Sequence, residues 1–274
     1  MALTMVVLAA GMGSRFGGPK QLVPIGPAGE CILDYNAHDA AQAGFDRIVV
    51  VTRPELEVEV AEVVERGVGR IADVRVVLQR IPAGRTKPLG TTDAVATAAA
   101  EVDGPFGVAN ADDLYGPRSF AVLRDHLGSQ ADVGANVGFR LGDTVPAVGS
   151  VSRALLQASA DGLVTEVAEL HGIHRTPDGW DPAGLTADTL VSMNLWGFPA
   201  ATMADLTEAR DRFAASGDPG EVFLPTEANA LIAAGRLRVA LLSTTETWAG
   251  LTNPDDITPV QAYAAARGDS PLWG

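Results

Sequence analysis

The chain has 274 residues, of which 47% are hydrophobic and 20% charged, a composition typical of a folded globular protein of one large domain or two smaller ones. Acidic residues outnumber basic ones by 34 to 20, which gives a formal net charge of −14. Such a surface repels nucleic-acid backbones, so no nucleic-acid partner is expected, although local cations beside a metal ion can still bind a small anion.

The first half of the sequence alternates short apolar runs with helical patterns. The apolar runs lie at 4–10, 46–52, 74–79 and 105–111, and the helical patterns at 32–44, 54–67, 91–102 and 117–128. Apolar strands separated by amphipathic helices of about 12 residues predict a parallel sheet wound in βα units. Ligands of such sheets bind at the carboxyl ends of the strands. Gly11, Thr52 and Asp112 all fall at strand ends, so we expect them to share one edge of the sheet.

The second half has a different pattern. Longer, alternating strands are predicted at 131–141, 145–154, 162–170 and 188–198, and a polar stretch at 171–188 is predicted to be a long loop or lid. Helices follow at 201–216 and 223–235, then a strand at 236–243 and a last helix at 254–268.

No Pro/Ser-rich linker separates the two halves. We therefore predict a single domain with two lobes, about 1–130 and about 131–274. The fold class is α/β, with a Rossmann-like, mostly parallel central sheet flanked by helices and a smaller mixed β lobe.

The stretch "LAAGMGSRFGGPKQL", residues 8–22, follows the first predicted strand. A dinucleotide-binding loop requires G-x-G-x-x-G and an acidic residue at the end of the second strand. Gly11 and Gly13 match, but Phe16 stands in place of the third glycine, and Thr52 and Arg53 end the second strand. The loop therefore does not fit a dinucleotide site.

A P-loop does not fit either. It requires G-x-x-x-x-G-K-[ST] opening directly into a helix. Gly13 and Gly18 have this spacing, but Pro19 precedes Lys20, and Gln21 replaces the hydroxyl residue.

What remains is a loop of small residues with two cations, Arg15 and Lys20. Small side chains let a ligand approach the main chain, and backbone N–H groups together with cations suit a triphosphate. Residues 8–20 resemble the signature L-A-A-G-x-G-[ST]-R…P-K of the nucleotidyltransferases that make nucleotide sugars, the NDP-sugar pyrophosphorylases. The resemblance implies catalytic roles for Arg15 and Lys20 and nucleotide binding by Leu8, Ala9, Ala10, Gly11, Gly13 and Ser14. An ordinary strand-to-helix turn with surface cations is the alternative.

The stretch "KPLGTTDAV", residues 87–95, resembles the G-T-[AGS]-x-A segment of the same family, where a helix begins beside the base and ribose. The resemblance implies nucleotide binding by Gly90 and Thr91. Thr91 or Thr92 is also expected to cap the helix that follows, which is the alternative role. Gln79, at the end of the third predicted strand, is a candidate reader of the base.

The stretch "VANADDLYG", residues 108–116, resembles the family motif G-D-x-x-[FY]. The resemblance implies that Asp112 is catalytic and binds Mg²⁺, the expected cofactor. Mg²⁺ takes one or two carboxylates and completes its shell with water and phosphate oxygens, so one aspartate at a sheet edge is a sensible ligand. Asp113 suits an Asx turn or a helix cap before Pro117.

Two further segments resemble acceptor-binding motifs. In "VSMNLWGF", residues 191–198, Asn194 matches the asparagine that binds sugar hydroxyls, although a buried structural hydrogen bond would equally satisfy it. In "VTEVAEL", residues 164–170, Glu169 matches the glutamate of the family's E-K-P segment, but Leu170 replaces the lysine. The charge for the acceptor's phosphate would then come from His171, His174 or Arg175, or those residues belong to a solvated loop.

A second departure lies in "TWAGLTNPDDI", residues 247–257. Many relatives have an acidic or asparagine metal ligand two residues after the tryptophan, and here that residue is Gly250. Asn253, Asp255 or Asp256 are substitutes, but the two aspartates also suit the N-terminus of the last helix. The histidines are too scattered for a zinc site.

Taken together, the resemblance implies the transfer of a nucleotidyl group from an NTP to a sugar 1-phosphate, giving an NDP-sugar and pyrophosphate by Mg-assisted in-line attack on the α-phosphorus. Two alternatives stay open. One is transfer to a non-sugar phosphate such as phosphocholine or a phosphonate, and the other is a non-catalytic, nucleotide-binding regulatory homologue. The sequence does not name the base, the acceptor or the oligomeric state, and a homo-oligomer is compatible with it.

The expected location is the cytoplasm. A single cysteine, Cys31, allows no internal disulfide and no thiolate metal site, which fits a reducing compartment. No apolar run approaches the roughly 20 residues that cross a bilayer, and the N-terminus lacks the basic region of a signal peptide, so no membrane partner is expected.

Overall fold

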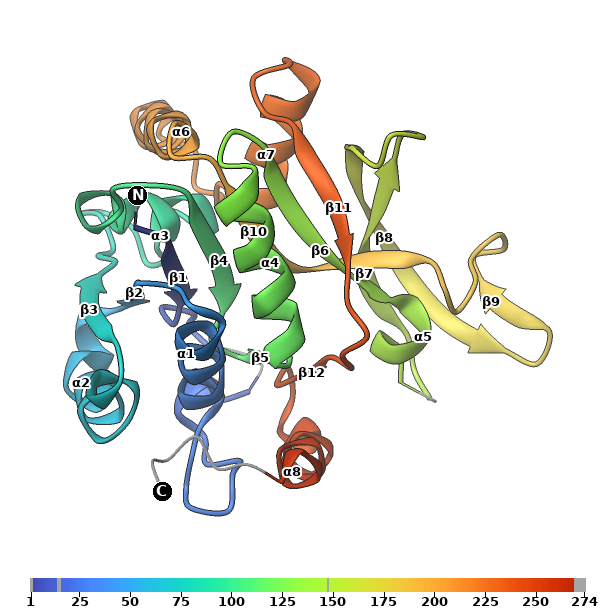
Figure 1. Cartoon of the computed structure of the whole chain (residues 1–274), viewed down its shortest axis with the longest axis horizontal. Coiled ribbons are helices and arrows are strands. Elements are labelled where there is room, and N and C mark those ends of the chain that lie inside the picture. The colour runs from blue at the N-terminus through green and yellow to red at the C-terminus, as the bar shows by residue number, and fades with distance from the viewer. Residues whose placement is uncertain (1, 14–15, 147, 269–274) are drawn as a thin grey trace.

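The computed structural model describes residues 2–13, 16–146 and 148–268, and it has an α/β fold built on one large mixed sheet (Figure 1). The strand order is β3-β2-β1-β4-β10-β7-β8-β9, with β6 paired to β10 and β11. The strands are β1 (Thr4–Leu8), β2 (Arg47–Thr52), β3 (Asp73–Leu78), β4 (Phe106–Asn110), β6 (Gly134–Arg140), β7 (Val151–Ala158), β8 (Val164–Thr176), β9 (Gly179–Asp181), β10 (Leu190–Phe198) and β11 (Val239–Ser243). A separate two-stranded ladder joins β5 (Asp113–Leu114) to β12 (Ala249–Gly250).

Helices cover both faces of the sheet. They are α1 (Ile32–Ala43), α2 (Glu57–Arg66), α3 (Thr91–Thr97), α4 (Pro117–Ser129), α5 (Leu141–Thr144), α6 (Thr202–Ser216), α7 (Leu224–Ala233) and α8 (Ile257–Arg267). Short 3-10 turns lie at Lys20–Leu22, Pro54–Leu56, Val68–Arg70, Ala99–Glu101 and Pro254–Asp256. None of the described helices is long and apolar enough to cross a membrane.

The parallel part of the sheet confirms the βα pattern of the first half. β1 pairs in parallel with β2 and β4, and Leu8 lies opposite Val51 on one side and Asn110 on the other. Because parallel strands run in the same direction, the chain leaves all three strands at the same edge of the sheet. The segments that follow β1 and β4 are therefore brought together there.

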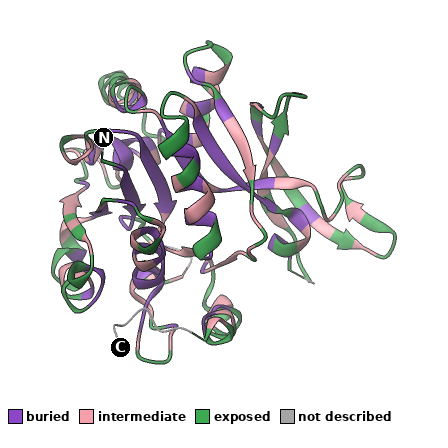
Figure 2. Cartoon of the chain, viewed as in Figure 1, coloured by how far each residue is buried: buried purple, intermediate pink, exposed green. Residues whose placement is uncertain are grey.

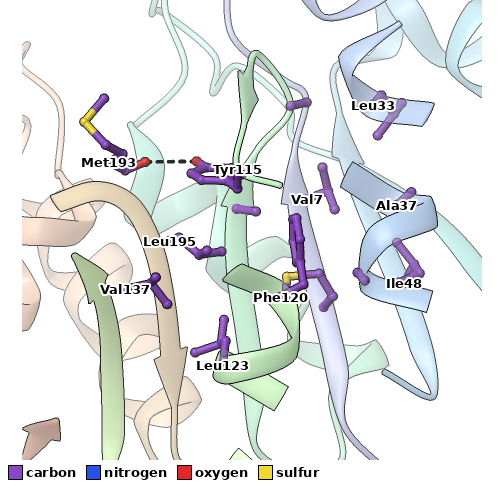
Figure 3. Packing of buried hydrophobic residues seen from close by; sticks show 14 of the residues in the cluster. Val7, Leu33, Ala37, Ile48, Tyr115, Phe120, Leu123, Val137, Met193 and Leu195 are labelled. Atoms are coloured by element: carbon purple, nitrogen blue, oxygen red, sulfur yellow. Dashed lines mark hydrogen bonds between the residues drawn. The ribbon is translucent and has the colours of Figure 1, made fainter. Parts of the chain in front are cut away.

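The apolar alternation of β1 explains the layers. Val7 packs with Leu33 of α1 and Phe120 of α4 on one face (Figure 3), whereas Val6 packs with Val95 of α3 on the other. Figure 2 shows these central strands buried between helices that expose their outer sides. Each fully buried side chain of this size contributes about 1.5–3 kcal/mol, so this packing fixes the position of the strand ends.

The second half corrects two sequence-based expectations. The strand expected from residue 145 begins only at Val151, because Pro146 lacks an N–H group and Gly149 has a φ of +94°. The loop or lid expected at 171–188 is also wrong in its first part. β8 continues to Thr176 and returns as β9, with Arg175 opposite Trp180. The guanidinium of Arg175 lies 4.6 Å from the centre of the Trp180 ring, which stabilises this hairpin.

The division into lobes at about residue 130 stays a prediction. One apolar cluster extends across that point, since it includes Val7 of β1, Val137 of β6 and Leu195 of β10 (Figure 3).

Candidate active site

A cavity of about 510 Å³ lies beside the carboxyl ends of β1 and β4, and we call it the first cavity. It collects most of the residues predicted to bind the nucleotide or to act in catalysis, namely Leu8, Ala10, Gly11, Gly13, Lys20, Gln79, Gly90, Thr91 and Asp112. The first and last of these residues, Leu8 and Asp112, are 104 positions apart in the sequence. The structure thus gathers them at one place, and their individual roles stay predictions.

Of the predicted nucleotide-loop residues that the structure describes, Ala9 does not line the first cavity. Ala9 is 1% exposed within the core, and its carbonyl accepts a hydrogen bond of 2.8 Å from the side chain of Gln21. Ser14 and Arg15 lie outside the described residues. The backbone of Ala9 is thus held by Gln21 and, through its N–H group, by the carbonyl of Val51 at 2.7 Å, and its predicted contact with the nucleotide stays a prediction.

The glycine-rich loop is held in shape by its own backbone. Gly13 has a φ of +60°, and a Cβ atom there would collide with the carbonyl of Gly18, so only glycine fits. The backbone N–H groups of Phe16 and Gly17 both donate to the carbonyl of Gly13, at 3.0 and 2.9 Å. The side chain of Arg53 donates to the carbonyl of Gly11 at 2.8 Å. This bond gives Arg53 a structural task at the strand end where a dinucleotide site would have an acid.

Lys20 and Asp112 form an ion pair on the wall of the first cavity. The Nζ atom of Lys20 also donates to the carbonyl of Leu251 at 2.8 Å. The two side chains are only 19% and 25% exposed, and both line the cavity. A cation and a carboxylate are therefore positioned together where a ligand would enter.

Asp113 lies directly behind this pair. β12 brings Gly250 opposite Asp113, and a Cβ atom on Gly250 would collide with Oδ1 of Asp113 and with the ring of Trp248. The carboxylate of Asp113 thus fills the space that a side chain at position 250 would need. Burial, and then the charge of Asp112, raise the pKa of Asp113 to about 7.

The cap that we expected from Asp113 is not formed. The N-cap of α4 is Gly116, which forms no side-chain capping bond. Asp113 instead belongs to β5 and accepts a hydrogen bond of 2.8 Å from the side chain of Asn110. Pairing with β12 draws Asp113 away from the start of the helix.

A hydrogen-bonded group of asparagines supports the end of β4. The amide of Asn194 donates to the side-chain oxygen of Asn110 at 2.8 Å, and its own oxygen accepts from Trp196 at 2.9 Å. Asn194 has a φ of +65° and sits where the pairing of β10 with β6 shifts register. Asn110 lines the first cavity, whereas Asn194 lies behind it. The geometry thus matches a structural role for Asn194, and its predicted contact with the acceptor stays a prediction.

Tyr115 also holds the end of β4 in place. Its hydroxyl donates to the carbonyl of Met193 at 2.9 Å (Figure 3) and accepts from the backbone N–H of Asn110 at 3.1 Å. Tyr115 is fully buried, so these bonds satisfy a hydroxyl that would otherwise be costly to bury.

The start of α3 forms another wall of the first cavity. Gly90 has a φ of +121°, and a Cβ atom there would collide with the backbone of Val222. The threonine cap that we expected is wrong, because the N-cap of α3 is Gly90 and no side-chain capping bond forms. The hydroxyl of Thr91 accepts instead from the backbone N–H of Leu224 at 2.8 Å. The segment before α7 lies against the helix start and takes the position of the cap.

Gln79 is fixed by its amide nitrogen. That nitrogen donates to the carbonyl of Gly90 at 3.0 Å and to Asp93 at 2.7 Å. Both bonds use the same atom, so the amide oxygen of Gln79 is the group that can accept a hydrogen bond from a base.

A second cavity, of about 910 Å³, lies between β7, the loop before it, β8 and the segment 248–260. It is lined by Asp143, Thr144, Val145, Pro146, Val148, Ser150, Val151, Ser152, Arg153, Glu169, Gly172, Trp248, Ala249, Gly250, Thr252, Asn253, Asp256, Pro259 and Val260. Thr252 lines both cavities. Of the predicted acceptor-binding residues, Glu169 lies here, and Leu170 packs against the apolar core.

The residues that could replace the lysine missing at position 170 do not lie together. His171 is exposed and hydrogen-bonded to Ser152 at 2.8 Å. His174 and Arg175 line an open hollow that adjoins the second cavity and shares Val148, Ser150 and Gly172 with it. Asp256 accepts from the backbone N–H groups of Thr252 and Asn253, at 2.8 and 2.6 Å. These bonds cap the 3-10 turn Pro254–Asp256, which leads directly into α8, whereas α8 itself has no side-chain capping bond.

The donor set at the first cavity fits Mg²⁺. Among the described residues, no cluster of three or more His, Cys, Asp and Glu side chains can hold a metal ion by itself. Mg²⁺ does not need such a cluster, because it is held by one or two carboxylates and by the phosphates of its substrate. Asp112, half-buried on the cavity wall, is suited to that arrangement.

Sequence reasoning missed several residues of the first cavity, namely Met12, Phe16, Thr86, Lys87, Pro88, Ala94, Asn110, Glu221 and Thr252. Lys87 could have been predicted from the sequence, because it is a cation directly before residues 88–91, which contain the predicted nucleotide-binding Gly90 and Thr91. Glu221 and Thr252 had none, because they arrive from distant parts of the chain through tertiary packing.

Comparisons with known proteins identify the fold and the family. A crystal structure from Bacillus anthracis, of a protein assigned as a glucose-1-phosphate thymidylyltransferase and solved with sucrose, superposes with a TM-score of 0.68. The alignment covers 96% of this chain and 95% of that one, at 14% sequence identity, so it shows a shared fold. A search of curated proteins finds no match. The model of the MobA-like NTP transferase domain matches residues 5–171, which is more than half of the sequence and includes Lys20, Asp112 and the glycine-rich loop. The chain therefore belongs to the MobA-like NTP transferase family of nucleotidyltransferases.

Proposed function

We propose that this nucleotidyltransferase joins an NTP to a sugar 1-phosphate, giving an NDP-sugar and pyrophosphate. The observation that carries the proposal is the first cavity, where a glycine-rich loop and the Lys20–Asp112 pair lie at the carboxyl ends of β1 and β4. A loop of this kind offers backbone N–H groups to phosphates, and the pair offers one cation and one metal ligand.

The chemistry requires positioning more than proton transfer. A phosphate oxygen of the acceptor is already ionised at neutral pH, so it attacks the α-phosphorus without a general base. The protein's task is to align the two substrates and to offset the charge that builds on the α-phosphate. Lys20 is assigned to the α-phosphate and Arg15 to the departing pyrophosphate. Mg²⁺, held by Asp112, would neutralise and orient the phosphate oxygens.

The ion pair also prepares the lysine. Asp112 and the carbonyl of Leu251 hold Nζ of Lys20 at the cavity wall. Such a preorganised cation needs little reorientation when a triphosphate arrives. Gln79 is assigned to the base, with its amide oxygen as the acceptor of a hydrogen bond.

The acceptor is assigned to the second cavity, which shares Thr252 with the first. Its wall presents the hydroxyls of Ser150 and Ser152, the amide of Asn253 and the carboxylate of Glu169. Groups of this kind hydrogen-bond the hydroxyls of a sugar. Transfer to a non-sugar phosphate and a non-catalytic role remain the competing functions.

One assay separates these functions. The purified protein is incubated with Mg²⁺, each of the four NTPs and, in turn, glucose 1-phosphate, mannose 1-phosphate, phosphocholine and 2-aminoethylphosphonate, and pyrophosphate release is measured. Release that depends on a sugar 1-phosphate supports the proposal. Release only with phosphocholine or the phosphonate shows the alternative acceptor. An NTP that stabilises the protein against heat without any release shows a binding protein, since ligand at 100 times its Kd adds about 2.7 kcal/mol of stability.

We also assign the whole chain to one nucleotidyltransferase domain, with residues 1–130 serving the nucleotide and 131–274 the acceptor, and place it in the cytoplasm. The single cysteine, buried and unpaired, supports a reducing compartment.

A further inference from the structure

One cation on the wall of the second cavity has no role in the site as described so far. Arg153 lies on β7, and its guanidinium carbon is 5.2 Å from the ring centre of Trp248. Both residues line the cavity. The ring holds the guanidinium by a cation–π contact and limits its motion.

The guanidinium is charged but poorly neutralised. It donates to the carbonyls of Ser152 and Thr144, and none of the described carboxylates lies within 4.0 Å of it. Its Nε atom is buried without a hydrogen-bond partner among the described residues, as is the indole nitrogen of Trp248. Burial lowers the pKa of Arg153, whereas the nearby charge of Asp113 raises it. A guanidinium has five N–H donors, so two carbonyl bonds leave donors for an anion.

The position of Arg153 links the two cavities. Its charge is felt by Asp113, which lies beside Asp112 and against Gly250. Gly250 and Thr252 line the second cavity with Arg153, and Leu251 between them accepts the hydrogen bond from Nζ of Lys20 in the first. The segment 250–252 therefore contacts both cavities.

The strand register explains how the cation comes to be there. In the ladder between β7 and β8, Arg153 lies directly opposite Leu170. Opposed residues of an antiparallel pair point to the same face of the sheet. Leu170 of β8 and Arg153 of β7 therefore lie side by side on the same face of the sheet.

We infer that Arg153 binds the phosphate of the acceptor, a hydroxylated phosphomonoester whose body occupies the second cavity. The fork of a guanidinium matches phosphate oxygens with paired hydrogen bonds. The hydroxyls and carboxylates along the rest of the wall suit hydroxyl groups on the same molecule. This inference rests on the proposed function, since it assigns the acceptor's anchor in the same reaction.

The test is a binding titration that does not depend on turnover. Calorimetry measures the affinity of wild type, Arg153→Gln and Arg153→Lys for glucose 1-phosphate, for mannose 1-phosphate and for glucose as an uncharged probe. Arg140→Gln is the control, because Arg140 is an exposed arginine of β6 paired with Asp188. Arg175→Gln tests the competing arginine at the adjoining hollow. Binding of each variant to Mg-NTP and its thermal unfolding are measured in parallel.

We expect Arg153→Gln to weaken sugar 1-phosphate binding by about 10- to 100-fold, the scale of lost charge-assisted hydrogen bonds, while Mg-NTP affinity stays within about twofold. Arg153→Lys should recover part of the loss, because a lysine keeps the charge. A structural role predicts equal losses for both substitutions. Unchanged affinity in Arg153→Gln, a loss in Arg175→Gln instead, or no binding of either phosphate by a wild type that binds Mg-NTP would overturn the inference. Failure of wild type to bind any NTP would instead reject the proposed function.

Discussion

The first and second cavities are built in different ways, although they share a wall. Most of the first cavity comes from three short segments, the loop after β1, the start of α3 and the end of β4, each continuous in sequence. The second is built from the segment 143–153, which includes the loop before β7, from β8 and from the segment 248–260, and strand pairing and tertiary packing bring these together. The segments of the first cavity carry recognisable sequence motifs, whereas Arg153 in the second is identified by its register opposite Leu170.

The backbone shows the same contrast. In the first cavity, glycines are required where the chain turns against itself, as at Gly13 and Gly90. Beside the second cavity, Gly250 is required because Asp113 from another strand fills the space. The glycine at position 250, where relatives carry a metal ligand, is therefore explained by the carboxylate of Asp113, which occupies the space that a side chain there would need.

The largest effect is expected in the first cavity. Lys20→Ala and Asp112→Ala should each lower turnover by at least ~100-fold, the scale of losing one preorganised electrostatic group. Pyrophosphate release under saturating NTP and acceptor measures it. Asp103→Ala, which removes an exposed carboxylate that is 78% accessible, is the control and should keep normal turnover. Near-normal release by either active-site variant would show that the first cavity is not the place of reaction.

The next effect is a dependence of stability on pH that arises from Asp113. The pKa of Asp113 is raised to about 7, so between about pH 4 and pH 7 the folded protein holds a proton that the unfolded chain has lost. Stability from this group is therefore complete below pH 4 and is lost as the pH rises through 7. The metal-free protein should lose on the order of 2–4 kcal/mol of unfolding free energy over this range through Asp113.

Asp113→Asn isolates that contribution. Urea unfolding at pH 5 and pH 8, with EDTA present, should show a smaller loss for the variant than for wild type. Parallel curves for the two proteins would mean that Asp113 titrates normally.

Gly250→Ala tests the packing of Asp113 against the segment 250–252, where the two cavities adjoin. The added methyl group collides with Asp113 and Trp248, so we expect about 1–3 kcal/mol of lost stability, typical of overpacking. The double variant Gly250→Ala with Asp113→Ala should lose less than the sum of the two single variants, because the collision with Asp113 is removed while that with Trp248 remains. Additive losses would show that Asp113 does not fill this space.

The smallest effect separates two roles for Asn194. Because its φ is +65°, Asn194→Gly should retain the backbone, while Asn194→Ala should be less stable by about 1 kcal/mol more. If the role is structural, both variants change the unfolding midpoint and leave the acceptor KM unchanged. A large rise in that KM with normal stability would restore Asn194 as a direct ligand of the acceptor.

The sequence was informative where structure is local. The parallel strands, the helices of the first half and the glycine-rich loop follow from apolar periodicity and from contiguous residues. The hairpin of β8 and β9 was missed because its polar composition resembles a loop, while cross-strand pairs such as Arg175 with Trp180 stabilise it.

Non-local pairing limited the prediction of the site. The hydroxyl of Thr91 was expected to cap its own helix, but a segment 133 residues later takes that hydrogen bond. Arg153 belongs to no sequence motif, and it becomes a candidate for binding the acceptor only through its register opposite Leu170 and its contact with Trp248. Such residues become visible once the strands are paired.

The bond from Lys20 to the carbonyl of Leu251 has a consequence for how the protein is made. It spans 231 positions, so a chain emerging from the ribosome exposes the glycine-rich loop long before the partner that fixes its lysine. Nζ of Lys20 is therefore set in place only after residue 251 has been synthesised and has folded back. Under the proposed function, the nascent chain gains its phosphate-binding geometry only when these two distant parts of the chain meet.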